Sequence, residues 1–258
     1  MDLAEKKHWD YVYANLNTNL SIGWQPDDYN SLVLEDILIK SLIDTSTKSI
    51  LEIGCGNSTW LPYLAKKTKA KITGIDYSEE GCLLLQKKLA LENLDGTVLC
   101  NDIFKIPLEN IICNDFVYSL GVVEHFIDLK EVVSQFSKFV EQGGRLFTEV
   151  PNLFSIHGIL CWIYQPALLK KHKLVTKNQL MKAYKANGFT EIKCHYAGLF
   201  SMSIVAWGIY QRFPKLSKFI DPFIMKVNKF IDRVLRKSKI YKGIPFFAPY
   251  IYIIGEKP

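Results

Sequence analysis

The stretch Ser49-Ile-Leu-Glu-Ile-Gly-Cys-Gly56 decides how this chain folds. A short apolar run of strand type ends here in a Gly-x-Gly turn, and residues Thr59 to Lys66 then follow with helical spacing. A glycine turn between a strand and a helix lets the backbone approach a ligand closely, but tight turns also use glycine for purely steric reasons. The turn by itself therefore favours a ligand site and a steric turn about equally.

Strand-like and helical segments alternate on both sides of this turn. Helical spacing is clearest at Glu79 to Leu91, Lys130 to Val140 and Lys177 to Ala186, and the last of these ends at the C-cap pair Asn187-Gly188. The predicted strands are Ser49 to Ile53, Ala70 to Asp76, Gly96 to Cys100, Asn114 to Ser119, Gly144 to Val150, Phe189 to His195 and Tyr250 to Gly255. Such alternation implies βαβ units and a parallel sheet, so we predict an α/β fold.

Acidic residues around the turn indicate what kind of ligand it would hold. Glu52 is too acidic a neighbour for a pyrophosphate but suits a ligand that carries an ammonium group. Thr59 stands where the dinucleotide-binding fingerprint has its third glycine, and Asp76 ends the next strand, where a carboxylate can accept both ribose hydroxyls. The combination predicts a nucleoside ligand without a pyrophosphate.

Asp102 follows the third predicted strand and is placed to receive an adenine amino group, with Ile103 and Phe104 as an apolar wall. Taken singly, an Asp at the start of a loop is better explained by an Asx turn. Its position in the series after Glu52 and Asp76 favours the ligand-binding interpretation.

Four motifs in order resemble those of class I S-adenosylmethionine-dependent methyltransferases. They are Leu51-Glu-Ile-Gly-Cys-Gly56, Gly74-Ile-Asp-Tyr-Ser78, Asn101-Asp102 and Tyr118-Ser-Leu-Gly-Val-Val-Glu-His-Phe126. The resemblance covers roughly residues 49–150 and implies S-adenosylmethionine as the cofactor. It also implies a Rossmann-like, doubly wound, mostly parallel sheet of seven strands with a C-terminal antiparallel hairpin and helical insertions.

The resemblance also implies which residues contact the cofactor. Glu52, Gly54 and Gly56 would surround the methionine part, Asp76 would bind the ribose, and Asp102 would lie at the adenine. The other residues of the expected cofactor site are Cys55, Tyr77, Ile103, Ser119 and Leu120. The segment His8-Trp-Asp-Tyr-Val-Tyr13, together with Trp24, resembles an aromatic lead-in that covers the cofactor; an amphipathic helix on the sheet edge is the equal alternative.

The expected organisation is one domain over residues 1–258, with a helical cover at 1–47, a cofactor-binding core at 48–150, and insertions at 151–174 and 200–247. Both insertions follow a strand, so they should lie at the carboxyl ends of the strands, where ligands bind in open α/β sheets. The apolar segment Gly158 to Leu169 would either roof an acceptor pocket or form ordinary core. We therefore expect the insertions to decide the acceptor.

Methyl transfer relies mainly on holding two reactants in line, and a general base helps when the acceptor is a hydroxyl. The candidate catalytic residues are Glu124, His125 and His172, with a structural role for the Glu124-His125 pair equally open. His157 is a further candidate, although an ordinary packing role is favoured for both His157 and His172. The six cysteines lack C-x-x-C pairs, and we predict no metal site.

Positive charge is concentrated near the C-terminus. Residues 211–242 hold ten Lys/Arg and two Asp, so the rest of a chain with net charge +6 is slightly acidic. The pattern over Asp221 to Lys237 predicts a basic amphipathic helix. This helix could dock on the sheet edge, contact a membrane surface through residues 205–240, or form a lid over an anionic acceptor. Docking is favoured, because an insertion must usually bury its apolar face on its own protein.

The chain contains no run of 18 apolar residues and no signal-peptide pattern, so we expect a cytoplasmic protein with possible peripheral membrane contact. The predicted function is methylation of a small-molecule or lipid-linked acceptor at oxygen or nitrogen. A cyclopropane-synthase-like enzyme and a non-catalytic cofactor-binding subunit are the alternatives. Nucleic acid is not expected as a partner, because Ser119-Leu-Gly-Val122 replaces the Asn/Asp-Pro-Pro-Tyr-like motif of RNA methyltransferases. The oligomeric state is left open.

Overall fold

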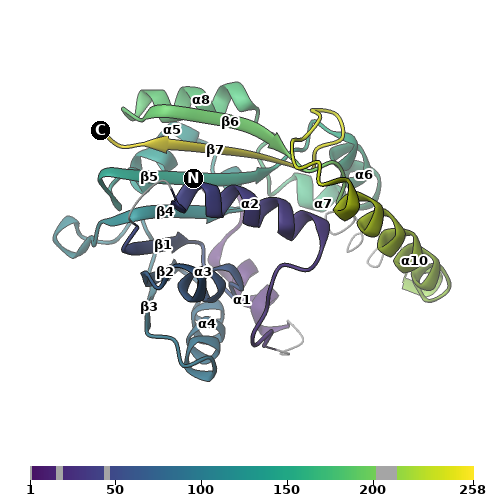
Figure 1. Ribbon diagram of the computed structural model, residues 1–258, viewed down its shortest axis with the longest axis horizontal. Coiled ribbons are helices and arrows are strands. Elements are labelled where there is room, and N and C mark those ends of the chain that lie inside the picture. The colour runs from purple at the N-terminus through teal and green to yellow at the C-terminus, as the bar shows by residue number, and fades with distance from the viewer. Residues whose placement is uncertain (1, 16–19, 44–46, 202–213) are drawn as a thin grey trace.

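A single seven-stranded sheet organises the computed structural model, which describes residues 2–15, 20–43, 47–201 and 214–258 (Figure 1). The strand order is β3-β2-β1-β4-β5-β7-β6, and β7 runs antiparallel to both of its neighbours. The strands are β1 (Ser49–Ile53), β2 (Lys71–Asp76), β3 (Gly96–Cys100), β4 (Asn114–Leu120), β5 (Val140–Pro151), β6 (Thr190–Ala197) and β7 (Tyr250–Glu256). The predicted α/β sheet with its C-terminal antiparallel pair is confirmed.

Helices cover both faces of the sheet, and each face has its own hydrophobic core. The cores form because β1 and β4 contribute buried residues to both sides, as central strands of a parallel sheet do. One core includes Val132, Phe136 and Leu180 from α5 and α8, and the other includes Leu38 from α2 and Leu85 from α4. The α-helices are α1 (Lys6–Ala14), α2 (Tyr29–Ile43), α3 (Trp60–Thr68), α4 (Glu79–Leu91), α5 (Leu129–Ser137), α6 (Ile156–Tyr164), α7 (Pro166–Leu169), α8 (Lys177–Ala186) and α10 (Pro214–Ser238).

Strand register brings the carboxyl ends of β1, β2 and β4 to one level. Ile53 at the end of β1 lies opposite Ile75 of β2 on one side and Ser119 of β4 on the other. The residues that follow these strands therefore meet at one edge of the sheet. The insertion helices α6, α7 and α10 lie toward the same side, as their positions in the chain predicted (Figure 1).

The predicted element bounds agree closely with the structure except at the start of β5 and at the start of α10, which begins at Pro214 and not at Asp221. A helix was predicted to continue to Val140, but α5 ends at Ser137 and β5 already begins at Val140. Val140 pairs with Asn114 ahead of an irregular register step, and Gly143 adopts a φ of 74° within this stretch. Long-range pairing, which local helical spacing does not reveal, extends the strand toward its N-terminal end.

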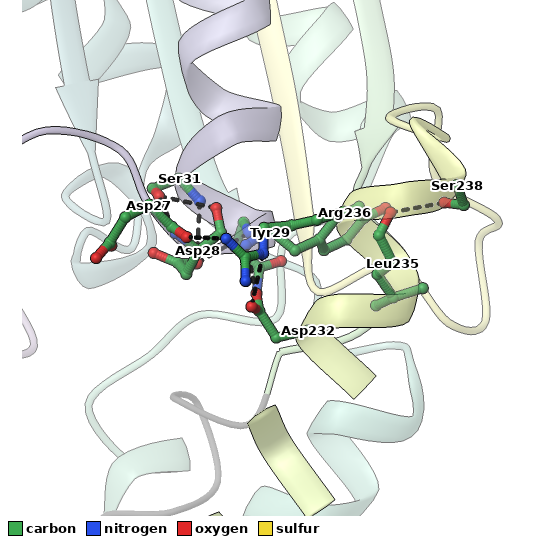
Figure 2. A network of polar contacts seen from close by, with 9 residues as sticks. Asp27, Asp28, Tyr29, Ser31, Asp232, Leu235, Arg236 and Ser238 are labelled. Carbon is green, nitrogen blue, oxygen red and sulfur yellow. Dashed lines mark hydrogen bonds and ion pairs between the residues drawn. The ribbon is translucent and has the colours of Figure 1, made fainter. Parts of the chain in front are cut away.

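Helix α10 is attached to the body near its C-terminal end (Figure 2). Asp232 accepts a hydrogen bond of 2.6 Å from the backbone N–H of Tyr29, and Arg236 donates one of 2.9 Å to the carbonyl of Asp27. Leu235 packs against the core cluster on this face of the sheet. These contacts fix α10 to the start of α2.

The expectation that α10 buries its apolar face on its own protein is met near its C-terminal end, where Leu235 packs on the core, but not farther out along its described side chains. Val227, Phe230 and Val234 are 38%, 65% and 49% exposed, because α10 runs outward from the body beyond its attachment at α2 (Figure 1). The aromatic stretch Trp207 to Phe213, which also entered the prediction, lies outside the described residues. Among the residues that the structure describes, none of the helices is both long and apolar enough to cross a membrane.

Candidate active site

A cavity of about 520 Å³ lies at the carboxyl ends of β1, β2 and β4. Its walls come from loops after these strands, from the segment after β3 and from helix α1. The lining residues are Asp2, Trp9, Tyr13, Ile53, Gly54, Ile75, Asp76, Tyr77, Asn101, Asp102, Ile103, Phe104, Leu120, Gly121, Val122, His125, Phe126 and Glu131. Six of the ten expected cofactor-site positions belong to this wall, and Gly56 lies against Tyr13 of the wall. The other three are described below.

The glycine turn after β1 forms the floor of the cavity. Gly54 has a φ of 76°, which side chains on L-residues rarely tolerate, and a Cβ there would lie 2.4 Å from Cγ2 of Val122. The N–H of Gly54 donates to the carbonyl of Ile75 at 2.8 Å, so the turn is fixed to β2. The bare backbone is therefore exposed to whatever occupies the cavity.

Asp76 joins the glycine turn to the turn after β2. Its carboxylate accepts hydrogen bonds of 2.8 Å from the backbone N–H of Gly56 and of 2.8 Å from that of Ser78. Burial raises the pKa of Asp76, and these two N–H groups oppose that rise. Each carboxylate oxygen keeps further acceptor capacity, and Asp76 belongs to the cavity wall.

Glu52 lies beneath the glycine turn and not in the cavity wall. It is buried and accepts a hydrogen bond of 2.8 Å from the hydroxyl of Tyr118. Burial raises the pKa of the Glu52 carboxyl to about 8, and the hydrogen bond from Tyr118 acts in the opposite direction. A bound cation nearby would favour the ionised carboxylate.

The wall opposite the glycine turn comes from residues after β2 and β3. Tyr77, Asp102, Ile103 and Phe104 all line the cavity. Asp102 also accepts a hydrogen bond of 3.0 Å from the N–H of Phe104 and pairs with Lys105 at 3.3 Å. The Asx-type turn and the position in the site, which were weighed as alternatives, are thus both present in this one residue.

Helix α1 covers the cavity with Trp9 and Tyr13. The hydroxyl of Tyr13 lies so close to the glycine turn that a Cβ on Gly56 would be 2.0 Å from it. Trp24, which was grouped with this lead-in, instead packs edge-on against Trp60 and Tyr63. The aromatic lead-in therefore splits into a cavity cover and a separate cluster on α3.

Three expected cofactor residues do not line the cavity with their side chains. Cys55 is buried toward Gly74, and Ser119 turns its hydroxyl to Thr148 at 3.2 Å. Glu52 is the third, as described above. Glu52 and Ser119 lie on opposite faces of the sheet, where each bonds to a side chain of a neighbouring strand, while Leu120 and Gly121 reach the cavity.

The three expected catalytic residues come together at one end of the cavity. Glu124 and His125 belong to the 3-10 turn Val123–His125 after β4, and His172 lies between α7 and α8. Ligand atoms of Glu124, His125 and His172 all lie within 4.8 Å of one another. His125 lines the cavity and also contacts Trp9 edge-on.

Hydrogen bonding fixes the tautomer of His125. Its Nδ1 lies 2.9 Å from the carbonyl oxygen of Lys171, which can only accept, so Nδ1 carries the proton. The lone pair on Nε2 can then accept a proton or bind a metal ion. Burial lowers the pKa of His125, which favours this neutral form.

His157, the further histidine candidate, has a structural position. It is fully buried, its Nδ1 lies 3.1 Å from the hydroxyl of Ser155, and its Nε2 accepts a hydrogen bond from the N–H of Ser201. The segment Gly158 to Leu169 contributes no residue to the cavity wall, and Ile159 and Trp162 point to solvent. The described side chains of this segment therefore do not line this cavity, and a role of the segment at the acceptor stays a prediction.

Sequence reasoning missed Asp2 as part of the wall. Asp2 bridges to Phe126, and its carboxylate accepts a hydrogen bond of 2.9 Å from the hydroxyl of Tyr77. The N–H of Leu3 donates to the carbonyl of His125 at 2.7 Å, so the N-terminal segment closes over the turn after β4. Nothing local in the sequence indicates a pairing between segments so far apart.

Comparison with known protein families identifies residues 51–148 as a methyltransferase domain. The chain is 26% identical over 143 residues to pavine N-methyltransferase of Thalictrum flavum, a match that spans 54% of this chain and 38% of that protein. It is 25% identical to demethylmenaquinone methyltransferase of Chlorobaculum tepidum over 81% of this chain and 76% of that protein. The match therefore spans less than two thirds of the length of pavine N-methyltransferase.

Among solved structures, the chain is similar to an S-adenosylmethionine-dependent methyltransferase from Archaeoglobus fulgidus. The two share 18% identity with a TM-score of 0.57, over 88% of this chain and 94% of the other. At this identity the likeness establishes the fold. The matched family domain spans β1 to β5 and so contains the glycine turn, Asp76, Asp102 and the turn with Glu124 and His125.

Proposed function

We propose that the chain, whose residues 51–148 match a methyltransferase domain, is a class I S-adenosylmethionine-dependent methyltransferase that transfers a methyl group to a small-molecule or lipid-linked acceptor. The observation that carries the proposal is the cavity at the carboxyl ends of β1, β2 and β4, where the glycine turn, Asp76 and Asp102 meet. A dinucleotide is disfavoured because Thr59 stands where the dinucleotide-binding fingerprint has its third glycine.

The residues present fit this cofactor. Gly54 offers bare backbone to the methionine part, and Asp76 offers carboxylate oxygens to the ribose hydroxyls. Ile103 and Phe104 give an apolar wall for the adenine, with Asp102 at its edge to accept from the amino group. The side chain of Glu52 lies outside the wall, bonded to Tyr118, and a bound cationic group would favour its ionised form.

When bound, the cofactor supplies an electrophilic methyl group on a sulfonium. The chain itself contributes position and exclusion of water: Trp9 and Tyr13 cover the cavity, and the backbone at Leu120 and Gly121 bounds it on the side of β4. Holding two reactants in near-attack geometry accounts for a large part of such catalysis. Glu124, His125 and His172 are the candidates for a general base toward a hydroxyl acceptor.

The test is calorimetric binding of S-adenosylhomocysteine to the full chain, combined with a mass-shift screen of cell extract. We expect binding of one S-adenosylhomocysteine per chain and a product heavier by one methyl group when S-adenosylmethionine is added. Absence of any heat with this ligand would overturn the proposal. Fragmentation of the product separates methyl transfer from the methylene bridge that a cyclopropane-synthase-like enzyme would introduce.

Helix α10 supports a further part of the proposed function, contact with an anionic membrane surface. Its exposed apolar stripe of Val227, Phe230 and Val234 lies beside an exposed basic stripe of Lys226, Lys229 and Arg233 on the same helix. An apolar face flanked by cations is typical of helices that lie in the interface of anionic membranes. A lipid-linked acceptor would then be presented on the side of the sheet where the cavity lies.

Replacing Lys226, Lys229 and Arg233 together by Gln should sharply lower co-sedimentation with vesicles that contain phosphatidylserine. Each basic residue near such a surface contributes about 1 kcal/mol of attraction. The matched control replaces Lys87, Lys182 and Lys185, which are exposed on α4 and α8, and should sediment like the wild type. Equal sedimentation of both triple variants and the wild type would contradict membrane contact through α10.

A further inference from the structure

The cluster of Glu124, His125 and His172 is held together by backbone contacts between two distant segments. The N–H of Lys173 donates to the carbonyl of Glu124 at 2.6 Å, and Nδ1 of His125 donates to the carbonyl of Lys171 at 2.9 Å. The residues on both sides of His172 are thus bonded to the turn that carries Glu124 and His125. The ring centroids of His125 and His172 lie 4.5 Å apart as a result.

Glu124 needs a partner that the described protein atoms do not supply. Its side chain is 2% exposed, and Oε2 has no hydrogen-bond partner. A buried polar atom that is left unsatisfied costs about 1–3 kcal/mol, and more if it is charged. A cation placed beside Oε2 would satisfy this buried atom.

We propose that Glu124, His125 and His172 bind a divalent first-row transition ion, an inference that rests on the proposed methyl transfer and extends it to the acceptor. Two imidazole nitrogens and one carboxylate oxygen form a donor set that zinc, cobalt and iron(II) accept, and the ligand atoms lie close enough to share one ion. The Nδ1–H of His125 is bonded to a backbone carbonyl, the outer-shell contact that metal-bound histidines usually make.

Three protein ligands leave at least one coordination position for an oxygen of the acceptor. His125 belongs to both the cluster and the cavity wall, so the cluster lies beside the cavity. A metal ion lowers the pKa of a hydroxyl that it binds, and the proton passes to water. The site therefore selects acceptors that present a hydroxyl oxygen, and its position next to the cofactor cavity sets that oxygen beside the methyl donor.

The experiment uses the untagged full chain, stripped with a chelator and titrated with Co²⁺ while visible absorption is recorded. We expect one Co²⁺ per chain, with absorption bands in the visible that free Co²⁺ lacks. His172→Ala should weaken Co²⁺ binding by at least about tenfold. His195→Ala removes an exposed histidine outside the cluster and should leave the Co²⁺ affinity unchanged.

S-adenosylhomocysteine binding, measured on the same samples, separates this inference from the proposed function. If S-adenosylhomocysteine binds but Co²⁺ binds equally well to the wild type and to His172→Ala, the metal site is overturned and the methyltransferase proposal stands. If Co²⁺ binds one to one but S-adenosylhomocysteine does not bind, the metal site stands and the methyltransferase proposal is overturned. Glu124→Gln keeps the shape of the side chain and provides a second variant, which should also lower the Co²⁺ affinity.

Discussion

Replacing Asp76 by Ala should weaken S-adenosylhomocysteine binding by about 100-fold, which corresponds to about 2.7 kcal/mol. The carboxylate of Asp76 lines the cavity, and no other acidic side chain follows β2 directly. Hydrogen bonds from ligand hydroxyls to a charged acceptor contribute about 1.5–3 kcal/mol each. The same carboxylate accepts from the N–H groups of Gly56 and Ser78, so its loss also loosens the glycine turn. Isothermal titration calorimetry measures the change.

Asp95→Ala is the matched control for this variant, because Asp95 is an exposed Asp in the loop between α4 and β3. Its S-adenosylhomocysteine affinity should equal that of the wild type. Asp76→Asn separates the two roles of the carboxylate, because Asn keeps one oxygen acceptor for the backbone but loses the charge. If Asp76→Ala unfolds at the same urea concentration as the wild type and binds S-adenosylhomocysteine with an affinity within threefold of it, Asp76 does not contribute to the cofactor site.

Gly158→Ala should lower the free energy of unfolding by about 3 kcal/mol, against the usual effect of this change in a helix. Alanine in place of glycine ordinarily stabilises a helix by about 1 kcal/mol. In α6, however, a Cβ on Gly158 would lie 1.9 Å from the carbonyl oxygen of Leu153. That carbonyl belongs to a tight turn in which Leu153 donates to the carbonyl of Pro151 and Ser155 donates to that of Asn152.

The turn cannot move aside easily, because the side chain of Asn152 donates to the carbonyls of Pro245 and Ala248 at 2.8 and 2.9 Å. Urea unfolding followed by circular dichroism measures the effect. Ile159→Ala changes the exposed neighbouring position on the same helix and should alter the free energy of unfolding by less than about 0.5 kcal/mol. A Gly158→Ala protein as stable as the wild type would contradict the close approach of α6 to this turn.

Local sequence patterns determined most of the sheet and its ligand edge. Central strands such as β1 could be predicted, because residues buried on both faces of a sheet form short continuous apolar runs. Gly54, Asp76 and Asp102 were predictable because parallel strands end at one edge, so that residues directly after β1, β2 and β3 must lie near one another. The separate hydrophobic and basic faces of α10 were also visible, because helical periodicity is a local property.

Tertiary structure alone decided what those patterns could not specify. The direction in which Glu52 and Ser119 point depends on strand register: Glu52 pairs with Tyr118 and bonds to it on one face of the sheet, whereas Ser119 pairs with Ile53 and bonds to Thr148 on the other. The closure of Asp2 over Phe126 and the meeting of His172 with Glu124 arise from contacts between distant segments. The outward course of α10 likewise follows from its attachment to α2 near one end, a contact that local sequence patterns do not predict.

The sequence by itself therefore determined the fold and the place of the cofactor cavity, because both follow from local periodicity and from chain order. The side-chain groupings that bear on the acceptor, such as His172 with Glu124, were decided by the tertiary structure, because contacts between distant segments create them.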